Sequence, residues 1–286
     1  MLTHGWPSTI VLFSEVIGPL SDPTAHGGAA SDAFDVVVPS LPGFGFSEKP
    51  VERGWNAERT ARAWGLLMQR LGYARYVAQG RDWGCVRYHR NGATARAWPG
   101  RNPLKLRADY SGRHPGEPVP DQKRAVAVLN DFREKGSAYF QLQATRPQTI
   151  GYALADSAVG QAAWIYDIFN SGTGNTGNPD AVISRDRMLD EITLFWLTNT
   201  AASSARFYLE QVALMGKHNN PGLVDLPVGV SVFPHDLPPA QSWASLVYPK
   251  LFYWHELDRG GHFPQFEVPQ LFTEELRRCF RKFRGA

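Results

Sequence analysis

The sequence predicts an α/β protein whose mostly parallel sheet is interrupted by a long helical insertion. Two observations support this class. In residues 1–84, short apolar or β-branched runs alternate with loops and with helical periodicity, as expected for parallel strands joined by crossover helices. The same alternation resumes with the runs 228–233 and 251–254, and the residues between the two regions show helical periodicity.

The first part of the predicted core contains strands, a helix and a sharp turn. Residues 1–7 are expected to form the end of a strand that runs into the loop "HGWP", and residues 34–39 a short buried strand. Asn56 is expected to cap a helix that ends at Gly72. A strand near residues 75–80 then leads into "GRDWG". The apolar positions of the helix are Ala61, Trp64, Met68 and Leu71.

The expected domain organisation is a core at residues 1–120, a helical lid at 121–222 and a second part of the core at 223–286. Helical periodicity within the lid is clearest in "RAVAVLNDF", "GQAAWIYDIF", "MLDEITLFWL" and "SARFYLEQVALM". The chain closes on a predicted helix with one apolar face. That face consists of Phe272, Leu276, Phe280 and Phe283.

Two features depart from the pattern of a full α/β domain. The chain opens almost at "HGWP", which predicts that early strands of the sheet are missing. Residues 87–120 are rich in Arg, Gly and Pro and have almost no apolar period, although a helix and a buried strand should follow the turn. Because regular sequence flanks this stretch on both sides, we hypothesise that it is translated in a wrong reading frame.

Composition excludes several functional classes. The 286 residues are 43% apolar and contain no apolar run of 18 residues, so no transmembrane helix or membrane anchor is expected. Cys85 and Cys279 have no metal-binding spacing, which argues against a disulfide framework or a zinc site and makes the cytoplasm the expected location. The net charge of +3 is concentrated in residues 81–124 without interleaved aromatic residues, so nucleic acid is not an expected partner.

Three polar residues follow predicted strands in the order Asp82, Asp236, His262. Side chains at the carboxyl ends of parallel strands converge on a common site. Nucleophile, acid and histidine also occur in this order in hydrolases with a nucleophile elbow. Glu256 and Asp258 lie closer to His262 in sequence, but they belong to the last strand and its exit, and ion pairing is expected of them. Asp236 is therefore the predicted partner of His262.

A carboxylate at the position of the usual elbow serine predicts a particular chemistry. Asp titrates near pH 4, so Asp82 is a nucleophile that needs no base to activate it. It can displace a leaving group from a strained or polarised carbon and form an alkyl ester, which a histidine base and its carboxylate partner then help water to hydrolyse. The flanking Gly80 and Gly84 are expected to allow close packing of the turn. Attack at sp³ carbon is predicted, and a carboxylic ester substrate is disfavoured.

The chain resembles the epoxide hydrolases of the α/β-hydrolase superfamily, specifically the microsomal-type branch that also occurs in bacteria. The motifs are "HGWP", "VVVPSLPGFGFSEKP", "AQGRDWG", "TRPQTIGYALADSAVGQAAWI", "ITLFWLTNTAASSARFYLE", "VGVSVFPHD" and "ELDRGGHFPQFEVP". Together they span most of the chain apart from residues 87–120. The "HGWP" and "GxDWG" motifs alone also suit haloalkane dehalogenases, whereas the lid segments are specific to this branch.

The resemblance implies an α/β-hydrolase fold and hydrolysis of an apolar epoxide to a vicinal diol. It makes Asp82 the nucleophile, His262 the base and Asp236 the acid that orients the base. The small-molecule epoxide would bind between core and lid. No metal and no cofactor are implied.

The resemblance also implies roles for four aromatic residues. Tyr208 and Tyr139 match the lid tyrosines that donate hydrogen bonds to the epoxide oxygen, and a phenol with a pKa near 10 suits that task. The backbone N–H groups of Trp83 and Trp6 are the expected oxyanion donors. Arg81 departs from the family, which usually has a small residue or His before the nucleophile.

Two alternatives remain open at this point. A haloalkane dehalogenase would use the same Asp-His-Asp triad but would need halide donors, typically Trp or Asn, in place of the paired phenols. An inactive truncated or frameshifted remnant would keep the triad in its sequence without assembling a site, and a sheet edge left open would favour its aggregation. The sequence also leaves open which epoxide is used and whether the chain forms a homo-oligomer.

Overall fold

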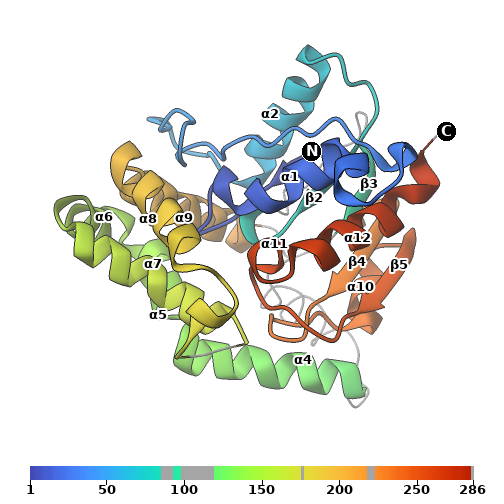
Figure 1. Ribbon diagram of the computed structural model, residues 1–286. Coiled ribbons are helices and arrows are strands. Elements are labelled where there is room, and N and C mark those ends of the chain that lie inside the picture. Colours follow the sequence, from blue (N-terminus) through green and yellow to red (C-terminus); the bar gives the residue numbers. More distant parts are fainter. Residues whose placement is uncertain (85–92, 98–118, 175–176, 218–222, 285–286) are drawn as a thin grey trace.

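The computed structural model describes residues 1–84, 93–97, 119–174, 177–217 and 223–284. Its centre is a sheet in the order β1-β2-β3-β4-β5, and every neighbouring pair of strands is parallel (Figure 1). The predicted α/β class with a mostly parallel sheet is confirmed. The strands are β1 (Leu2–Thr3), β2 (Tyr76–Gly80), β3 (Ala93–Ala97), β4 (Val228–Val232) and β5 (Leu251–Glu256).

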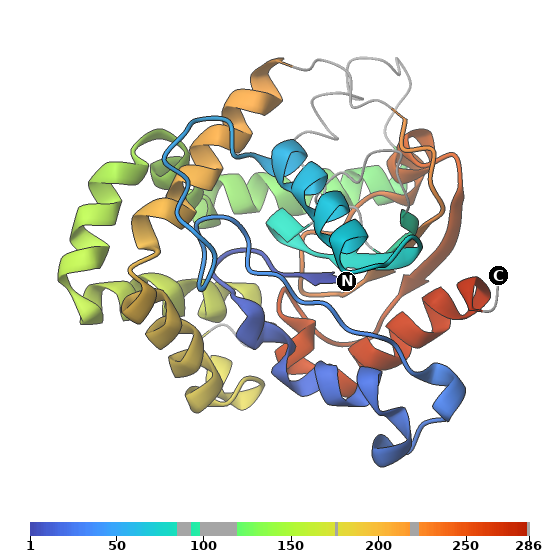
Figure 2. The ribbon, with the colours of Figure 1, turned by 90° about the horizontal axis from the view of Figure 1, so that it is seen from above.

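Helices cover both faces of this sheet, as a parallel sheet requires. Figure 2 shows α1 and α12 on one side of the strands, with α2 and α10 toward the other. The buried apolar residues of these helices join those of the strands in the core. The helices of the core are α1 (Ser14–Ser21), α2 (Ala57–Arg70), α10 (Gln241–Val247), α11 (Pro264–Glu267) and α12 (Pro269–Phe280).

Helix α2 begins and ends near the residues that the sequence predicts. The Asn56 side chain accepts hydrogen bonds from two backbone N–H groups of the first turn, and Gly72 has a φ of +85° just after the helix. Trp64 and Met68 are buried as predicted. The prediction for Leu71 is wrong, because this residue caps the helix at its carboxyl end and is 51% exposed.

The prediction of a strand at residues 34–39 is also wrong. This segment is extended but only partly buried and belongs to no strand. Its backbone approaches the sheet where the Leu2 N–H donates a 2.9 Å hydrogen bond to the Val37 carbonyl. Because the neighbouring strand β1 is only two residues long, it offers little backbone for a ladder.

The strand β3 lies within the stretch 87–120, in which the sequence shows no apolar period. It pairs with β2 on one side and with β4 on the other. A strand after the elbow is therefore present despite the irregular sequence. Three other expectations fall on residues that lie outside the described part of the chain. They are the helix expected after the elbow, most of the stretch for which we hypothesise a wrong reading frame, and Cys85.

The helices of the insertion gather beside the sheet (Figure 1). Helices α5 and α6 both pack against α9, and α7 packs against α6 and α8. Three of the predicted helical segments lie in α7, α8 and α9, whereas the sequence analysis did not single out α5 or α6. These helices are α5 (Ala138–Thr145), α6 (Pro147–Asp156), α7 (Ala158–Gly172), α8 (Arg185–Thr198) and α9 (Ala201–Lys217).

Helix α4 (Pro120–Asp131), which contains the fourth predicted helical segment, packs with the core. Its Ala125 belongs to the same buried cluster as Val228 and Trp243, and its Asp121 side chain accepts a hydrogen bond from the Ser242 N–H at 3.0 Å. The lid limits of 121–222 and the core limits of 1–120 and 223–286 stay a prediction. Short non-α turns are η1 (Ile10–Phe13), η2 (Pro23–His26), η3 (Ala30–Asp32), η4 (Asp82–Gly84), η5 (Phe132–Gly136), η6 (Pro179–Ala181) and η7 (Arg281–Phe283).

In the part of the chain that the structure describes, none of the helices combines the length and the apolar character that crossing a membrane requires.

Candidate active site

The turn at Asp82 has the strained geometry of a nucleophile elbow. Asp82 follows β2 and has a φ of +51°, in the left-handed region that non-glycine residues rarely adopt. A Cβ on Gly84 would lie 2.1 Å from the Thr3 carbonyl oxygen, so only glycine lets the turn pack against β1. The predicted need for a small residue at this position is confirmed. The strain and the close packing together fix the direction of the Asp82 side chain.

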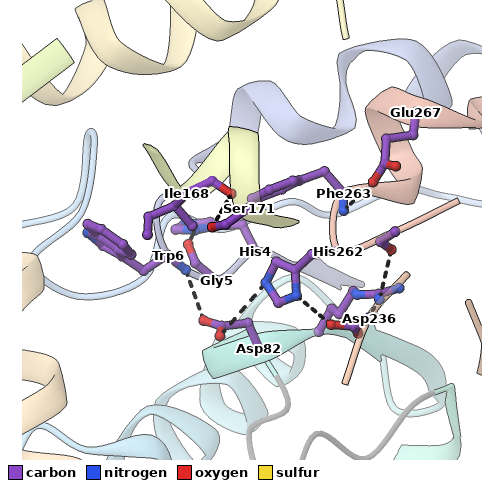
Figure 3. A network of polar contacts seen from close by, with 12 residues as sticks. His4, Gly5, Trp6, Asp82, Ile168, Ser171, Asp236, His262, Phe263 and Glu267 are labelled. Carbon is purple, nitrogen blue, oxygen red and sulfur yellow. Dashed lines mark hydrogen bonds and ion pairs between the residues drawn. The ribbon is translucent and has the colours of Figure 1, made fainter. Parts of the chain in front are cut away.

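The two oxygens of Asp82 have different surroundings (Figure 3). Oδ1 accepts a 3.0 Å hydrogen bond from the Trp6 N–H, and Oδ2 lies 4.0 Å from Nε2 of His262. Burial raises the pKa of Asp82, and the facing His262 and the backbone N–H groups of Trp6 and Trp83 oppose this rise. The side chain is still 22% exposed, so a small molecule can reach the carboxylate.

The loop that supplies the Trp6 N–H is held by a buried histidine. The Leu41 N–H donates to Nε2 of His4 at 3.0 Å, which places the ring proton on Nδ1, 2.9 Å from the Gly5 carbonyl. Burial lowers the pKa of His4 to about 4, so the ring is neutral. Two loops are thereby joined beside Asp82.

His262 follows β5 and contacts Asp236, which follows β4. Nδ1 of His262 lies 2.8 Å from Oδ1 of Asp236 (Figure 3). The backbone N–H of His262 donates to the Gly172 carbonyl at 2.7 Å. Of the two acids closer in sequence, Glu256 instead pairs with Arg124 at 3.7 Å. The structure thus brings His262 to Asp236.

The charges around this pair have opposing effects. Burial alone would raise the pKa of Asp236, but the Arg81 guanidinium and then His262 hold it well below its usual range. Burial lowers the pKa of His262, but the Asp236 carboxylate outweighs this effect and the net shift is upward. Asp236 is therefore ionised, and it stabilises the protonated form of the imidazole.

The two predicted lid tyrosines stand together above the elbow. Tyr139 in α5 and Tyr208 in α9 have ring centroids 6.2 Å apart. Trp6 stacks on Tyr139 with a centroid distance of 5.2 Å, and Trp83 meets Tyr208 edge to face at 4.7 Å. All four predicted aromatic residues form one cluster.

The phenol hydroxyls of this cluster are protonated. Burial, followed by the charge of nearby Asp82, raises the pKa of Tyr139; for Tyr208 burial, Tyr139 and Asp82 all contribute in the same direction. The Tyr208 hydroxyl is buried and forms no well-aligned hydrogen bond within the described residues. Tyr208 interacts with Tyr139 and with the Trp83 side chain only in poorly aligned contacts, so its hydroxyl can turn its donor toward a substrate oxygen near the carboxylate.

The sequence analysis missed two carboxylates, one partly buried and one fully buried. Glu267 in α11 accepts a 2.8 Å hydrogen bond from the Phe263 N–H, next to His262. Glu191 in α8 is fully buried and accepts a 2.6 Å hydrogen bond from the Thr9 hydroxyl. Glu191 directly precedes the apolar run "ITLFWL", and a glutamate beside such a run was the signal that could have indicated its burial.

Among the described residues, no group of three or more His, Cys, Asp or Glu side chains is arranged to hold a metal ion. The groups around Asp82 include carboxylates, an imidazole, phenols and backbone amides. Arranged as they are, they can attack a carbon atom, protonate an oxygen and activate water.

Comparison with known proteins identifies the class. A family model described as the alpha/beta hydrolase fold matches residues 1–90. The structure superposes on the crystal structure of juvenile hormone epoxide hydrolase from the silkworm Bombyx mori with a TM-score of 0.83 and 27% identity, covering 99% of this chain and 72% of that chain. With the parallel sheet and the elbow at Asp82, these matches define an α/β-hydrolase.

Sequence relatives narrow the class to a family. The chain is 52% identical over 298 residues to "Putative epoxide hydrolase" from Stigmatella aurantiaca, covering 100% of this chain and 64% of that protein. It is 34% identical to "Epoxide hydrolase 1" from Sus scrofa, covering 97% of this chain and 66% of that protein. The chain belongs to the epoxide hydrolase family. It spans just under two thirds of the length of these two curated relatives.

Proposed function

We propose that this protein hydrolyses an apolar epoxide to a vicinal diol through an ester of Asp82. One observation carries the proposal. The protonated phenols of Tyr139 and Tyr208 lie near the Asp82 carboxylate, which also faces His262 and its partner Asp236. An epoxide needs a nucleophile on carbon and a proton donor on oxygen at the same time. This site offers both.

In the first step, Oδ2 of Asp82 attacks an epoxide carbon and the carbon–oxygen bond of the ring breaks. The leaving oxygen takes a proton from one of the two tyrosines, Tyr139 or Tyr208, and the other stabilises the developing charge by a hydrogen bond. The product of this step is a hydroxyalkyl ester of Asp82 and one phenolate. The phenolate recovers its proton when the site returns to its resting state.

In the second step, Nε2 of His262 takes a proton from a water molecule that attacks Cγ of Asp82. The negative charge that develops on Oδ1 is stabilised by the N–H groups of Trp6 and Trp83, the first of which already binds this oxygen. The Cγ–Oδ2 bond of the ester then breaks, the leaving oxygen takes the proton that His262 accepted, and the diol departs. The carboxylic acid that remains on Asp82 gives its proton to the phenolate, which restores both the carboxylate and the phenol. Asp236 orients His262 and stabilises the imidazolium that forms.

The surroundings of the site favour an apolar substrate. The rings of Phe140 and Phe207 pack against Trp83, and those of Trp6 and Tyr208 complete an aromatic wall. Such a wall binds apolar groups through burial of their surface. We therefore propose a small-molecule epoxide with apolar substituents as the ligand between core and lid. A cytoplasmic location remains a prediction from the sequence, and whether the chain forms a homo-oligomer stays open.

A single turnover in water labelled with oxygen-18 tests the proposal. With enzyme in excess over an aryl or alkyl epoxide, the diol should form with little label, and the label should appear in the peptide that carries Asp82. Label in the diol from the first turnover would mean direct attack by water and would contradict the ester mechanism. Halide release from haloalkanes with no epoxide turnover would instead support a haloalkane dehalogenase.

A further inference from the structure

The side chain of Arg81, which precedes the nucleophile, belongs to the acid–base pair of the site. The side chain is only 8% exposed, and its Nη2 donates both to Oδ2 of Asp236 and to the Gly261 carbonyl, the latter at 3.0 Å. The guanidinium carbon lies 5.0 Å from the ring centroid of Phe233. One guanidinium therefore connects the loops that follow β2, β4 and β5.

This arrangement divides the Asp236 carboxylate between two partners. Oδ1 faces Nδ1 of His262, and Oδ2 faces Arg81. The Gly261 carbonyl that Arg81 also binds belongs to the peptide unit directly before His262. Arg81 thus restrains the acid through its side chain and the base through its backbone.

The charges that face His262 are three carboxylates and one guanidinium. Asp236 and Asp82 raise the pKa of His262, Arg81 lowers it, and Glu267 in α11 interacts with both cationic groups. The contact from α7 is uncharged: the His262 N–H donates a hydrogen bond to the backbone carbonyl of Gly172. Arg81 supplies the guanidinium charge in this set.

We propose that Arg81 is a positioning residue that holds Asp236 and the His262 loop together, and that its positive charge favours the neutral form of His262 in the ester-hydrolysis step. The role of Arg81 in ester hydrolysis rests on the proposed function, whereas the effect of its charge on the pKa of His262 does not. His262 faces three carboxylates in the free protein and two in the ester, where Asp82 carries no charge. Without a nearby cation, such a base would hold its proton over a wider pH range. Arg81 reduces that effect while leaving Asp236 free to orient the ring.

The test is a titration of His262 in the free protein by NMR, with its signal assigned by comparison with His262→Gln. Replacing the guanidinium by an uncharged side chain of similar length in Arg81→Met should raise the midpoint by about one pH unit, the lower end of what a near charge produces. The matched variant Arg81→Lys keeps the charge and should stay near the wild-type midpoint. The acid limb of single-turnover ester hydrolysis should move with the NMR midpoint.

The outcomes separate this inference from the proposed function. An unchanged midpoint in folded Arg81→Met, or equal midpoints for the Met and Lys variants, would overturn it. If Arg81→Met does not fold, the double variant Arg81→Met/Asp236→Asn is used instead, because it buries no unpaired carboxylate. Its His262 midpoint is compared with that of Asp236→Asn alone. A higher midpoint in the double variant supports the inference, and equal midpoints overturn it. Lack of epoxide turnover by the wild type would refute the proposed function while the titration still decides the role of Arg81.

Discussion

Two groups of side chains in the site are held in place by different forces. We call Asp82, Asp236 and His262 the core half, and Tyr139 and Tyr208 of the predicted lid the lid half. Asp82, Asp236 and His262 are fixed by directional contacts: a backbone N–H on one carboxylate, a guanidinium and an imidazole on the other. Tyr139 and Tyr208 are fixed by ring packing against tryptophans of the core. The charged atoms are therefore tied to the backbone, whereas the phenols are positioned through their apolar faces.

This difference shows how one site can be both rigid and available. A buried charge needs hydrogen bonds, and the same bonds define where it points. A buried phenol gains most of its free energy from the area of its ring, so its hydroxyl can remain without a firm partner until substrate arrives. The comparison predicts that changes in the core half reduce turnover more than changes in the lid half do.

The largest effect is expected for Asp82→Asn. A neutral amide is a poor nucleophile, so diol formation should fall by about 10⁴-fold or more, as found when a nucleophile is removed from other enzymes. The amide oxygen can still accept from the Trp6 N–H, so the fold should persist. Single-turnover diol formation measures the effect, with circular dichroism as the control. Full activity in the first turnover would exclude Asp82 as the nucleophile.

The next largest effect is expected for His262→Gln. Loss of the base should slow hydrolysis of the ester by 10²–10⁴-fold, the usual contribution of a general base, and leave its formation intact. One equivalent of epoxide should then be consumed in a burst, and mass spectrometry should find the adduct on the peptide that contains Asp82. A variant that neither consumes epoxide nor accumulates an adduct would show that His262 acts in the first step instead.

Much of the core half could be predicted from the sequence. Glycine and aspartate in "GRDWG" after an apolar run define the elbow, and polar residues after strands define the other two loops, because parallel strands end at one edge. The strand expected at residues 34–39 failed because its pairing depends on the neighbouring strand, which is only two residues long. The directions of Arg81 and Glu191 depend on distant partners, Asp236 and Thr9, which local patterns do not contain.

The lid half could be predicted only through resemblance. Tyr139 and Tyr208 lie on helices that are separated along the chain, and no spacing rule brings them together. Helical periodicity indicates which faces are apolar but not which hydroxyl faces the core. Their convergence is a tertiary property, which the structure shows in ring centroids 6.2 Å apart and in the packing of both rings against the tryptophans beside Asp82.

The lid half is probed directly by Tyr208→Phe and Tyr139→Phe. Each variant should slow ester formation by about 10- to 100-fold, because one of two donors to the leaving oxygen is lost. Hydrolysis of the ester should keep its rate. Stability should barely change in Tyr208→Phe, since its hydroxyl forms no well-aligned bond within the described residues. Stopped-flow kinetics of the two steps and a urea titration check this; a large loss of stability would show that the hydroxyls hold the lid.

The dependence of turnover on pH sharpens the contrast further. The base must be neutral, and the pKa of His262 is raised above its ordinary value of 6.5. Turnover limited by ester hydrolysis should therefore rise with pH through a midpoint above 6.5 and fall about tenfold per pH unit below it. Tyr208→Phe should not move this midpoint when hydrolysis is measured alone. A midpoint below 6.5 would mean that His262 is not the group that titrates.

The smallest effect on turnover is expected for Glu191, the buried carboxylate through which lid helix α8 contacts the core loop at Thr9. Burial raises its pKa from 4.5 to about 8. The folded protein therefore binds more protons than the unfolded chain between these values, so the free energy of unfolding falls as pH rises from 4.5 to 8, by a few kcal/mol. In Glu191→Gln, whose amide oxygen can still accept from the Thr9 hydroxyl, this part of the pH dependence should vanish.

Urea titrations at pH 5, 6.5 and 8 compare the wild type with Glu191→Gln, and the exposed neighbour Asp190→Asn serves as a matched control. The Gln variant should equal the wild type at pH 5 and exceed it at pH 8, while Asp190→Asn follows the wild type throughout. Equal slopes in all three proteins would mean that Glu191 is ionised in the folded state. The junction of lid and core would then be a charged contact like those of the core half, and the division between the two halves would not extend to it.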